Sequence, residues 1–244
     1  VNDDANQLSS VKREGDIVGY NNDGIVKWSG VFSQAEYNNG MLSAFFNISG
    51  SNSGYKRIDY FRKKDLVLAD TVIKEALGTH PYFGEIVSDT VTYNGRVYTI
   101  DSEEAQFTST NWKWIRGYTI KSGANFNLDD RNNIFFNLGY ISKAPRFNNV
   151  FSKDNLLFRD IKNEEVKAIE GGYSYRSSKF SANVNIYYTL WENKPSDGGV
   201  SIEIDDVTYR ANINGMDALH KGFEMDFVYR ILNNLSVEGL LSLG

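Results

Sequence analysis

The chain of 244 residues carries 26 Lys and Arg against 31 Asp and Glu, a formal charge of −5, so it lacks the clustered basic surface that nucleic-acid binding needs. It has no cysteine, which excludes disulfides, thiolate-bound zinc and iron–sulfur clusters, and its two histidines leave little material for a histidine-based metal or catalytic site. Aromatic residues make up 14% although only 41% of the residues are hydrophobic, a mixture typical of a β-rich carbohydrate binder or of an outer-membrane barrel.

Apolar and polar residues alternate with a period of two, which predicts β-strands. The clearest segment is 179–192, where Phe180, Val184 and Ile186 share one face and Asn183 and Asn185 the other. Most of these segments match the roughly 9–11 residues that a tilted strand needs to cross a bilayer. In chain order, we predict strands at 25–37, 41–49, 112–128, 133–142, 165–176, 179–192, 222–230 and 235–244.

Within the longest connection, residues 65–77 show a helical pattern. Leu66, Val72, Ile73 and Leu77 would share one face of a helix. We therefore predict a short amphipathic helix here, which either covers the mouth of a barrel or only packs against it.

The connections alternate in length. Short turns rich in Asn, Asp, Gly and Ser lie at 38–40, 129–132, 176–178 and 231–234, and long connections at 50–111, 143–165 and 193–221. Tight periplasmic turns and long extracellular loops are typical of outer-membrane barrels. The predicted fold class is all-β: an antiparallel transmembrane β-barrel, of which about eight strands are present.

Aromatic side chains are predicted near both ends of the strands, where two interfacial girdles would lie. Tyr175 and Phe180 flank a short turn. Arg116 lies on the presumed lipid face and is predicted at the membrane interface, where a charge costs less than at the midplane. Residues near the opposite strand ends are Trp112, Trp114, Tyr140 and Trp191.

No set of residues has the spacing of a catalytic or metal site. The adjacent acids Glu103–Glu104, Asp129–Asp130 and Asp205–Asp206 are interpreted as solvated, and His80 as an ordinary loop residue. Residues 193–221, with Asp197, Glu203, Asp205 and Asp206, are the best of the weak cation candidates. We predict no enzymatic activity, no cofactor and no metal.

Ligand contacts are predicted in two places. Loop aromatics with suitable chemistry are Tyr82, Phe83, Tyr93 and Tyr98. Polar residues on the presumed lumen face are Asn183, Asn185, Glu224 and Asp226.

Three motifs resemble a known family. They are Ser142-Lys-Ala-Pro-Arg-Phe147, Asn163-Glu-Glu165 leading into Glu170-Gly-Gly-Tyr173, and Lys221-Gly-Phe-Glu-Met-Asp226. Each is weak alone, but their order and spacing over 24–244 resemble the barrel of TonB-dependent outer-membrane receptors, especially those of Bacteroidetes-type bacteria. Such barrels have about 22 strands. By this resemblance, residues 1–244 are part of one β-barrel domain, and the plug domain is not present.

The resemblance implies energised uptake of a scarce ligand across the outer membrane of a Gram-negative bacterium. Implied partners are the TonB complex, acting through the absent plug, the lipid bilayer, an extracellular ligand and a surface lipoprotein; nucleic acid is not among them. Siderophore, haem, cobalamin, glycan and peptide all stay open as ligand classes. The alternatives are a soluble β-rich glycan-binding module and a small complete outer-membrane barrel.

Overall fold

The computed structural model describes residues 4–6, 12–82, 85–151, 157–195, 200–204, 207–211 and 215–244, with the backbone alone described at 80–82, 85–86, 200–204 and 207–211. The long strands are β1 (Asn22–Asn38), β2 (Leu42–Asp59), β10 (Lys113–Asn127), β11 (Asn132–Lys143), β12 (Glu164–Arg176), β13 (Phe180–Lys194), β16 (Met216–Leu232) and β17 (Leu235–Leu243). The short strands are β3 (Lys64–Val67), β4 (Val72–Leu77), β5 (Thr79–Tyr82), β6 (Glu85–Ser88), β7 (Val91–Tyr93), β8 (Arg96–Tyr98), β9 (Ala105–Gln106), β14 (Val200–Ile204) and β15 (Val207–Ala211), and a 3₁₀ turn, η1, spans Phe147–Asn149.

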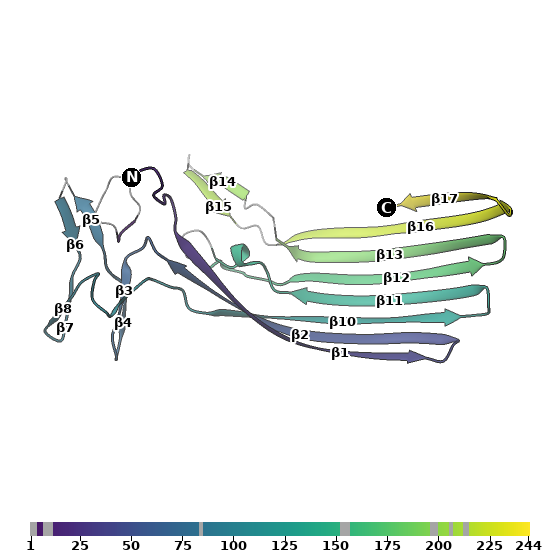
Figure 1. The fold of residues 1–244 in the computed structure, drawn as a ribbon, viewed down its shortest axis with the longest axis horizontal. Coiled ribbons are helices and arrows are strands. Elements are labelled where there is room, and N and C mark those ends of the chain that lie inside the picture. The colour runs from purple at the N-terminus through teal and green to yellow at the C-terminus, as the bar shows by residue number, and fades with distance from the viewer. Residues whose placement is uncertain are drawn as a thin grey trace. The chain divides into compact units, whose positions relative to one another are not determined.

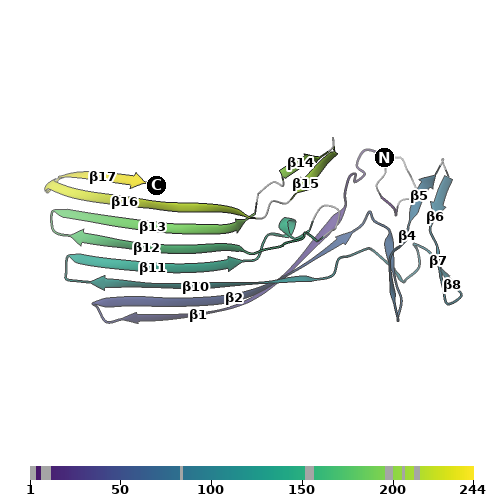
Figure 2. The same ribbon diagram turned by 180° about the vertical axis from the view of Figure 1, so that it is seen from behind.

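The long strands form one antiparallel sheet in the order β1-β2-β10-β11-β12-β13-β16-β17. Figure 1 shows the four short turns, which join β1 to β2, β10 to β11, β12 to β13 and β16 to β17, at the same end of this sheet. Figure 2 shows the same strand order from behind. The remaining connections, at 60–112, 144–163 and 195–215, are long. The predicted alternation of short and long connections is therefore confirmed.

Side chains of Asn and Asp close the short turns. Asn38 Oδ1 accepts the backbone N–H of Gly40 at 2.8 Å, and Gly40 has a positive φ of 85°, which glycine adopts without strain. In the next turn, Asp129 Oδ1 accepts the N–H of Arg131 at 2.7 Å and that of Asn132 at 2.8 Å. These hydrogen bonds, led by the one from Arg131, hold the pKa of Asp129 below its ordinary value.

The predicted strands are all present, but β2 runs ten residues further than the alternation indicated, to Asp59 instead of residue 49. Its second half is rich in Gly and Ser, so apolar alternation gives no signal there. Backbone pairing maintains the strand: Asp59 N–H donates to Thr108 O, and Thr110 N–H donates to Arg57 O, each at 2.9 Å.

The chain divides into two compact units. Unit 1 comprises Val1–Lys27, Gly54–Lys113 and Phe151–Leu157, and unit 2 comprises Trp28–Ser53, Trp114–Val150 and Phe158–Gly244. That residues 1–244 belong to one β-barrel domain stays a prediction.

The helix predicted at 65–77 is wrong, because this segment of unit 1 forms the hairpin β3–β4. Leu68 N–H donates to Thr71 O at 2.9 Å and closes the turn. β9 pairs with the other side of β3. The β-branched residues Val67 and Val72 lie opposite each other in the hairpin. The spacing of the apolar residues is compatible with a helix and with a hairpin, and this cross-strand pair favours the hairpin.

Unit 1 has its own apolar core. Leu66 and Leu77 are fully buried, and Tyr98 is 7% exposed beside them. Residues packed around these three are Leu68, Ile73, Ala76, Val91, Tyr93, Ile100 and Ala105. The apolar residues assigned to one helix face therefore do share a core, although strands rather than a helix carry them there.

Asp65 is a buried carboxylate at the edge of this core, with a side chain only 4% exposed. Lys74 Nζ lies 2.7 Å from Oδ2, while Thr108 Oγ1 at 2.6 Å and Glu75 N–H at 2.9 Å donate to Oδ1. Burial raises the pKa of Asp65, but the hydrogen bonds from Lys74, Thr108 and Glu75 outweigh it, so that the pKa lies below its ordinary value.

Because the folded-state pKa of Asp65 is lowered, its contribution to stability is complete above the unfolded pKa of about 3.9 and is lost as the pH falls through the lower folded value. We expect Asp65→Asn to destabilise unit 1 by about 1–3 kcal/mol at neutral pH, since a buried ion pair to a half-exposed lysine is lost. Hydrogen–deuterium exchange of peptides spanning 64–77, corrected for the intrinsic pH dependence, measures this local stability. The loss of local stability at acid pH should disappear in Asp65→Asn and persist in Asp70→Asn. Identical pH profiles in both variants would contradict the role of Asp65 in this loss.

Candidate functional site

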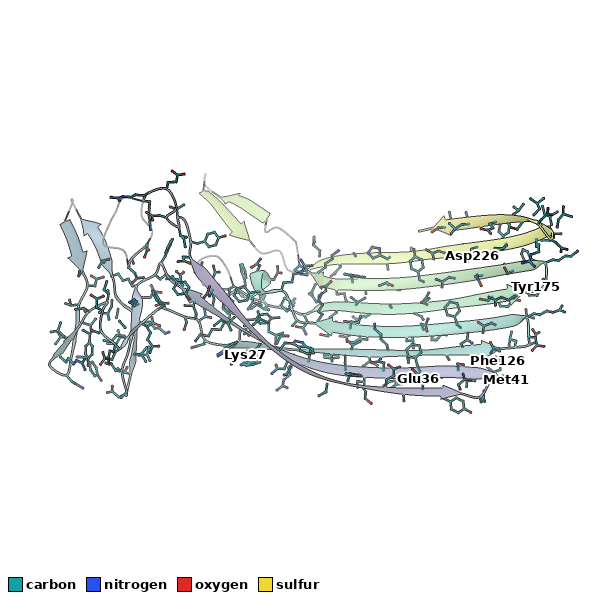
Figure 3. All side chains as sticks on the ribbon, in the orientation of Figure 1. Lys27, Glu36, Met41, Phe126, Tyr175 and Asp226 are labelled. Atoms are coloured by element: carbon teal, nitrogen blue, oxygen red, sulfur yellow. The ribbon has the colours of Figure 1, made fainter. Side chains whose placement is uncertain are left out.

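The two faces of the eight-stranded sheet differ in chemistry. One row across unit 2 reads Phe126, Ile134, Tyr173, Val184 and Met225, each the register partner of the next. Side chains on this face are apolar and yet exposed; Ile186, for example, is 60% exposed. An exposed apolar surface of this extent indicates a face that contacts lipid or a partner rather than water. Figure 3 draws the side chains on the strands and labels Phe126 and Tyr175 near the short-turn end of the sheet.

Aromatic rings cluster on the apolar face at the short-turn end. The ring centroid of Phe180 lies 6.1 Å from that of Tyr175, 6.5 Å from that of Phe227 and 6.4 Å from that of Tyr229. Three adjacent strands, β12, β13 and β16, supply these rings. The predicted clustering of Tyr175 and Phe180 beside a short turn is therefore present.

Towards the long connections, the apolar face ends in mixed chemistry. Tyr118 and Tyr140 stack with centroids 5.5 Å apart, and Lys167 forms an ion pair with Glu192. Arg116, two residues beyond Tyr118, is exposed, and its position at the membrane interface stays a prediction. Trp191 corrects the prediction of a second girdle: its odd position places it on the opposite face, where its ring meets His220 at a centroid distance of 6.3 Å.

The opposite face is polar and carries two hydrogen-bonded groups of amides and carboxylates. Asn183 Nδ2 donates to Asp226 Oδ2 at 2.8 Å. Asn185 Nδ2 donates to Glu170 Oε1 at 2.9 Å, and Asn137 Nδ2 approaches Glu170 Oε2 at 3.3 Å. The polar face of unit 2 therefore has two hydrogen-bonded groups, Asn183 with Asp226 and Asn137 with Glu170 and Asn185, which together draw on four strands.

The structure brings the four lumen candidates together. Asn183 pairs in register with Asp226, and Asn185 with Glu224. Glu170, which joins this group from β12, belongs to one of the family motifs but was not among the predicted ligand contacts. The available signal was its place in the alternation of 165–176, but only the strand register shows which residues it faces.

Aromatic rings cover several glycines of the polar face. A side-chain carbon added at Gly172 would collide with the ring of Phe135, its register partner, and one at Gly222 would lie 2.5 Å from the Tyr187 hydroxyl, also across the strand pair. Gly139 differs, because an added carbon there would meet only Ala168 Cβ at 3.8 Å. The polar face is therefore filled at the first two positions and open at the third.

At Gly139 the polar face forms a shallow hollow of about 390 Å³. Lys121 and Ala168 are the register partners of Gly139, and Asn137 and Glu170 form the next row. The hollow is lined by Phe45, Lys121, Asn137, Leu138, Gly139, Ile141, Val166, Ala168 and Glu170. Lys121 is exposed and makes no ion pair within the part of the chain that the structure describes. The hollow therefore offers a free ammonium, a hydrogen-bonded carboxylate and apolar walls, which suit a polar organic group better than a bare metal ion.

The aromatic residues predicted as ligand contacts in the longest connection differ in their surroundings within unit 1. Tyr98 belongs to the apolar core, and Tyr93 packs on that core while its hydroxyl donates to Asp70 Oδ2 at 2.7 Å. This hydrogen bond is the main cause of a raised pKa for Tyr93. For Tyr82 only the backbone, in β5, is described, and Phe83 lies outside the described residues. A ligand contact by any of them stays a prediction.

The cation candidates gain no support. Asp197, Asp205 and Asp206 lie outside the described residues, as do the side chains of Glu203 and His80. Among the residues that can be assessed, no three His, Asp or Glu side chains gather as metal ligands would. No helix in the described ranges is long and apolar enough to span a membrane.

An antiparallel sheet with one exposed apolar face, one polar face and all its short turns at one end is a section of a transmembrane β-barrel. Among solved structures, the fold is similar to that of "Copper transporter OprC", with a TM-score of 0.56 and 13% sequence identity. The match covers 90% of this chain but only 30% of that one, so the chain spans less than a third of its length. No family model matches the sequence, and no curated protein does. The fold class predicted from the sequence is confirmed.

Proposed function

We propose that the chain forms part of the barrel wall of an outer-membrane transporter of the TonB-dependent type. One observation carries the proposal: the same eight strands present an exposed apolar face and, on the other side, a polar face with a charged hollow. Contact with lipid requires the apolar face, and a hydrated lumen that admits a solute requires the polar face. The similarity to a copper transporter supports transport as the function, and the sequence motifs favour the Bacteroidetes-type receptors.

The same face weighs against the alternatives. A soluble glycan-binding module needs its apolar faces packed into a closed core, whereas Ile134, Leu138 and Ile186 are each at least 45% exposed. A small complete barrel of eight strands needs its first and last strands to pair. Among the described strands, β1 and β17 stand at opposite edges of the sheet and are not neighbours. Both observations favour a section of a larger barrel.

In this proposal, the polar face lines the interior of the transporter. Lys121 attracts an anionic group of the ligand, and the Glu170 carboxylate accepts a hydrogen bond from a donor group of the ligand. The TonB complex acts on a plug domain that is not in this chain, and a surface lipoprotein covers the extracellular side. The ligand is then an organic molecule with at least one anionic group, such as a siderophore, haem or a peptide.

Fractionation of the native full-length protein tests the proposal. We expect it in the outer membrane, extractable only with detergent, and with an electrophoretic mobility that changes on heating. A protein that is monodisperse in buffer without detergent would overturn the proposal in favour of the soluble module.

We expect Lys121→Gln to reduce ligand uptake by on the order of tenfold, because a charge-assisted hydrogen bond contributes about 1.5–3 kcal/mol. Uptake is measured as the growth of cells on a limiting nutrient for which growth depends on the full-length protein. The amount of heat-modifiable protein is measured in parallel. Lys143→Gln is the matched control, since Lys143 lies at the end of β11 and its ammonium is 3.9 Å from Glu164. Equal growth of the two variants would remove the hollow from the ligand path.

A further inference from the structure

Gly171 is a position without a side chain among exposed apolar residues of the apolar face. Gly171 of β12 pairs with Phe136 on one side and with Ile186 on the other. In the adjacent rows, Tyr173 and Ile169 of β12 carry large side chains. Gly171 therefore leaves a gap within a grid of large apolar residues.

No neighbouring side chain fills this gap. A carbon added at Gly171 would lie 3.6 Å from Phe135 O and 3.7 Å from Phe136 Cδ2, which is ordinary van der Waals contact. By contrast, Gly239 on the same face is covered by the ring of its partner Phe227. The result at Gly171 is a hollow of about 440 Å³ lined by Phe136, Ile169, Glu170, Gly171, Gly172, Tyr173, Val184, Ile186, Tyr187 and Tyr188.

A cation lies next to this hollow on the side of the long connections. Lys221 of β16 is the register partner of Tyr188, which lines the hollow, and it shares the apolar face. Lys221 is exposed and makes no ion pair among the residues that the structure describes. Lys167, the other lysine near the hollow on this face, is already paired with Glu192.

We infer that the hollow at Gly171 binds an acyl chain of a membrane lipid with a net anionic phosphate headgroup, and that this headgroup contacts Lys221. The inference rests on the proposed outer-membrane location, because the hollow lies midway between the Phe180 ring cluster and Glu192 on β13, where hydrocarbon surrounds the sheet. Transfer from bulk lipid gives no hydrophobic gain, so binding is driven by dispersion contacts that an unfilled hollow lacks and by the charge of Lys221. The hollow is apolar and has a free ammonium at its rim. It therefore suits an amphipathic anion, whose acyl chain fills the hollow while its headgroup contacts the ammonium.

Native mass spectrometry of the full-length protein, released from mild detergent with dioleoylphosphatidylglycerol as the probe, tests the inference. We expect the wild type to retain a bound lipid, and Gly171→Leu to lose most of that retention because leucine fills the hollow. Gly171→Ala should give an intermediate loss. Ala182→Leu is the matched control, because it adds the same side chain to the same face outside the hollow and should retain the lipid.

The headgroup is tested separately. Lys221→Gln should lower retention of dioleoylphosphatidylglycerol several-fold towards that of dioleoylphosphatidylcholine. Heat-modifiable mobility confirms that each variant is folded. Equal retention by Gly171→Leu and Ala182→Leu in a protein that resides in the membrane would overturn the lipid site alone, whereas a protein soluble without detergent would overturn the proposed function as well.

Discussion

Replacing Ile186 with lysine is expected to destabilise the sheet by about 2–4 kcal/mol in a bilayer. Ile186 lies on β13, six residues from Phe180 in the turn-end ring cluster and six from Glu192, which pairs with Lys167 at the other end. It is therefore at the centre of the apolar band, where an ammonium on a side chain that is 60% exposed would meet hydrocarbon. At this central position the side chain of lysine is too short to bring its charge to either interface without strain, whereas Lys221, in the row of Tyr188, lies two residues nearer the long-connection end.

The thermal midpoint of the full-length protein in detergent, and the fraction that reaches the heat-modifiable form in cells, measure this effect. Asn185→Lys is the control, since the neighbouring residue faces the polar side and donates to Glu170. A lysine there gains carboxylate neighbours and should change stability little. If both variants assembled equally well, the assignment of the two faces would be wrong.

Leu77→Ala is expected to destabilise unit 1 by about 2–5 kcal/mol. Leu77 is fully buried against Leu66 and Tyr98, so truncation removes apolar contacts and leaves a cavity in a small core. The cost should be large relative to the stability of the unit, because few other side chains share this core.

Hydrogen–deuterium exchange of peptides from β3, β4 and β8 separates this effect from that of Ile186→Lys. Leu77→Ala should increase exchange in unit 1 and leave β12 and β13 of unit 2 protected. Val97→Ala, at a position that is 57% exposed in the same unit, is the control and should change exchange little. Unchanged protection of unit 1 in Leu77→Ala would show that the core does not stabilise it.

Alternation of side chains was sufficient to predict the membrane-type sheet, because a strand with different solvents on its two faces must alternate strictly. Residues 179–192 and 133–142 are examples, and their strands begin and end within two residues of the predicted bounds. The Asn and Asp turns were equally readable, since Asn38 and Asp129 form local hydrogen bonds. Features that depend on residues close together in the chain can therefore be predicted from the sequence.

The segment 65–77 shows where such signals fail. Leu66, Ile73 and Leu77 fit both a helix face and a hairpin, and only the pairing of β3 with β4 and β9 decides between them. Trp191 was misplaced for a related reason: proximity to a strand end indicated a girdle, but the strict alternation of β13 sets its face.

By itself, then, the sequence determined the all-β class, the eight long strands, the short turns between them and the polarity of each face, because these follow from local periodicity. Only the tertiary structure decided which residues form a site. Lys121, Asn137 and Glu170 come from three strands, and the hollow beside them exists because no ring covers Gly139. The same holds for Gly171 on the other face. An uncovered glycine is indistinguishable in sequence from Gly172, which Phe135 covers, since cross-strand register alone decides which residue lies opposite.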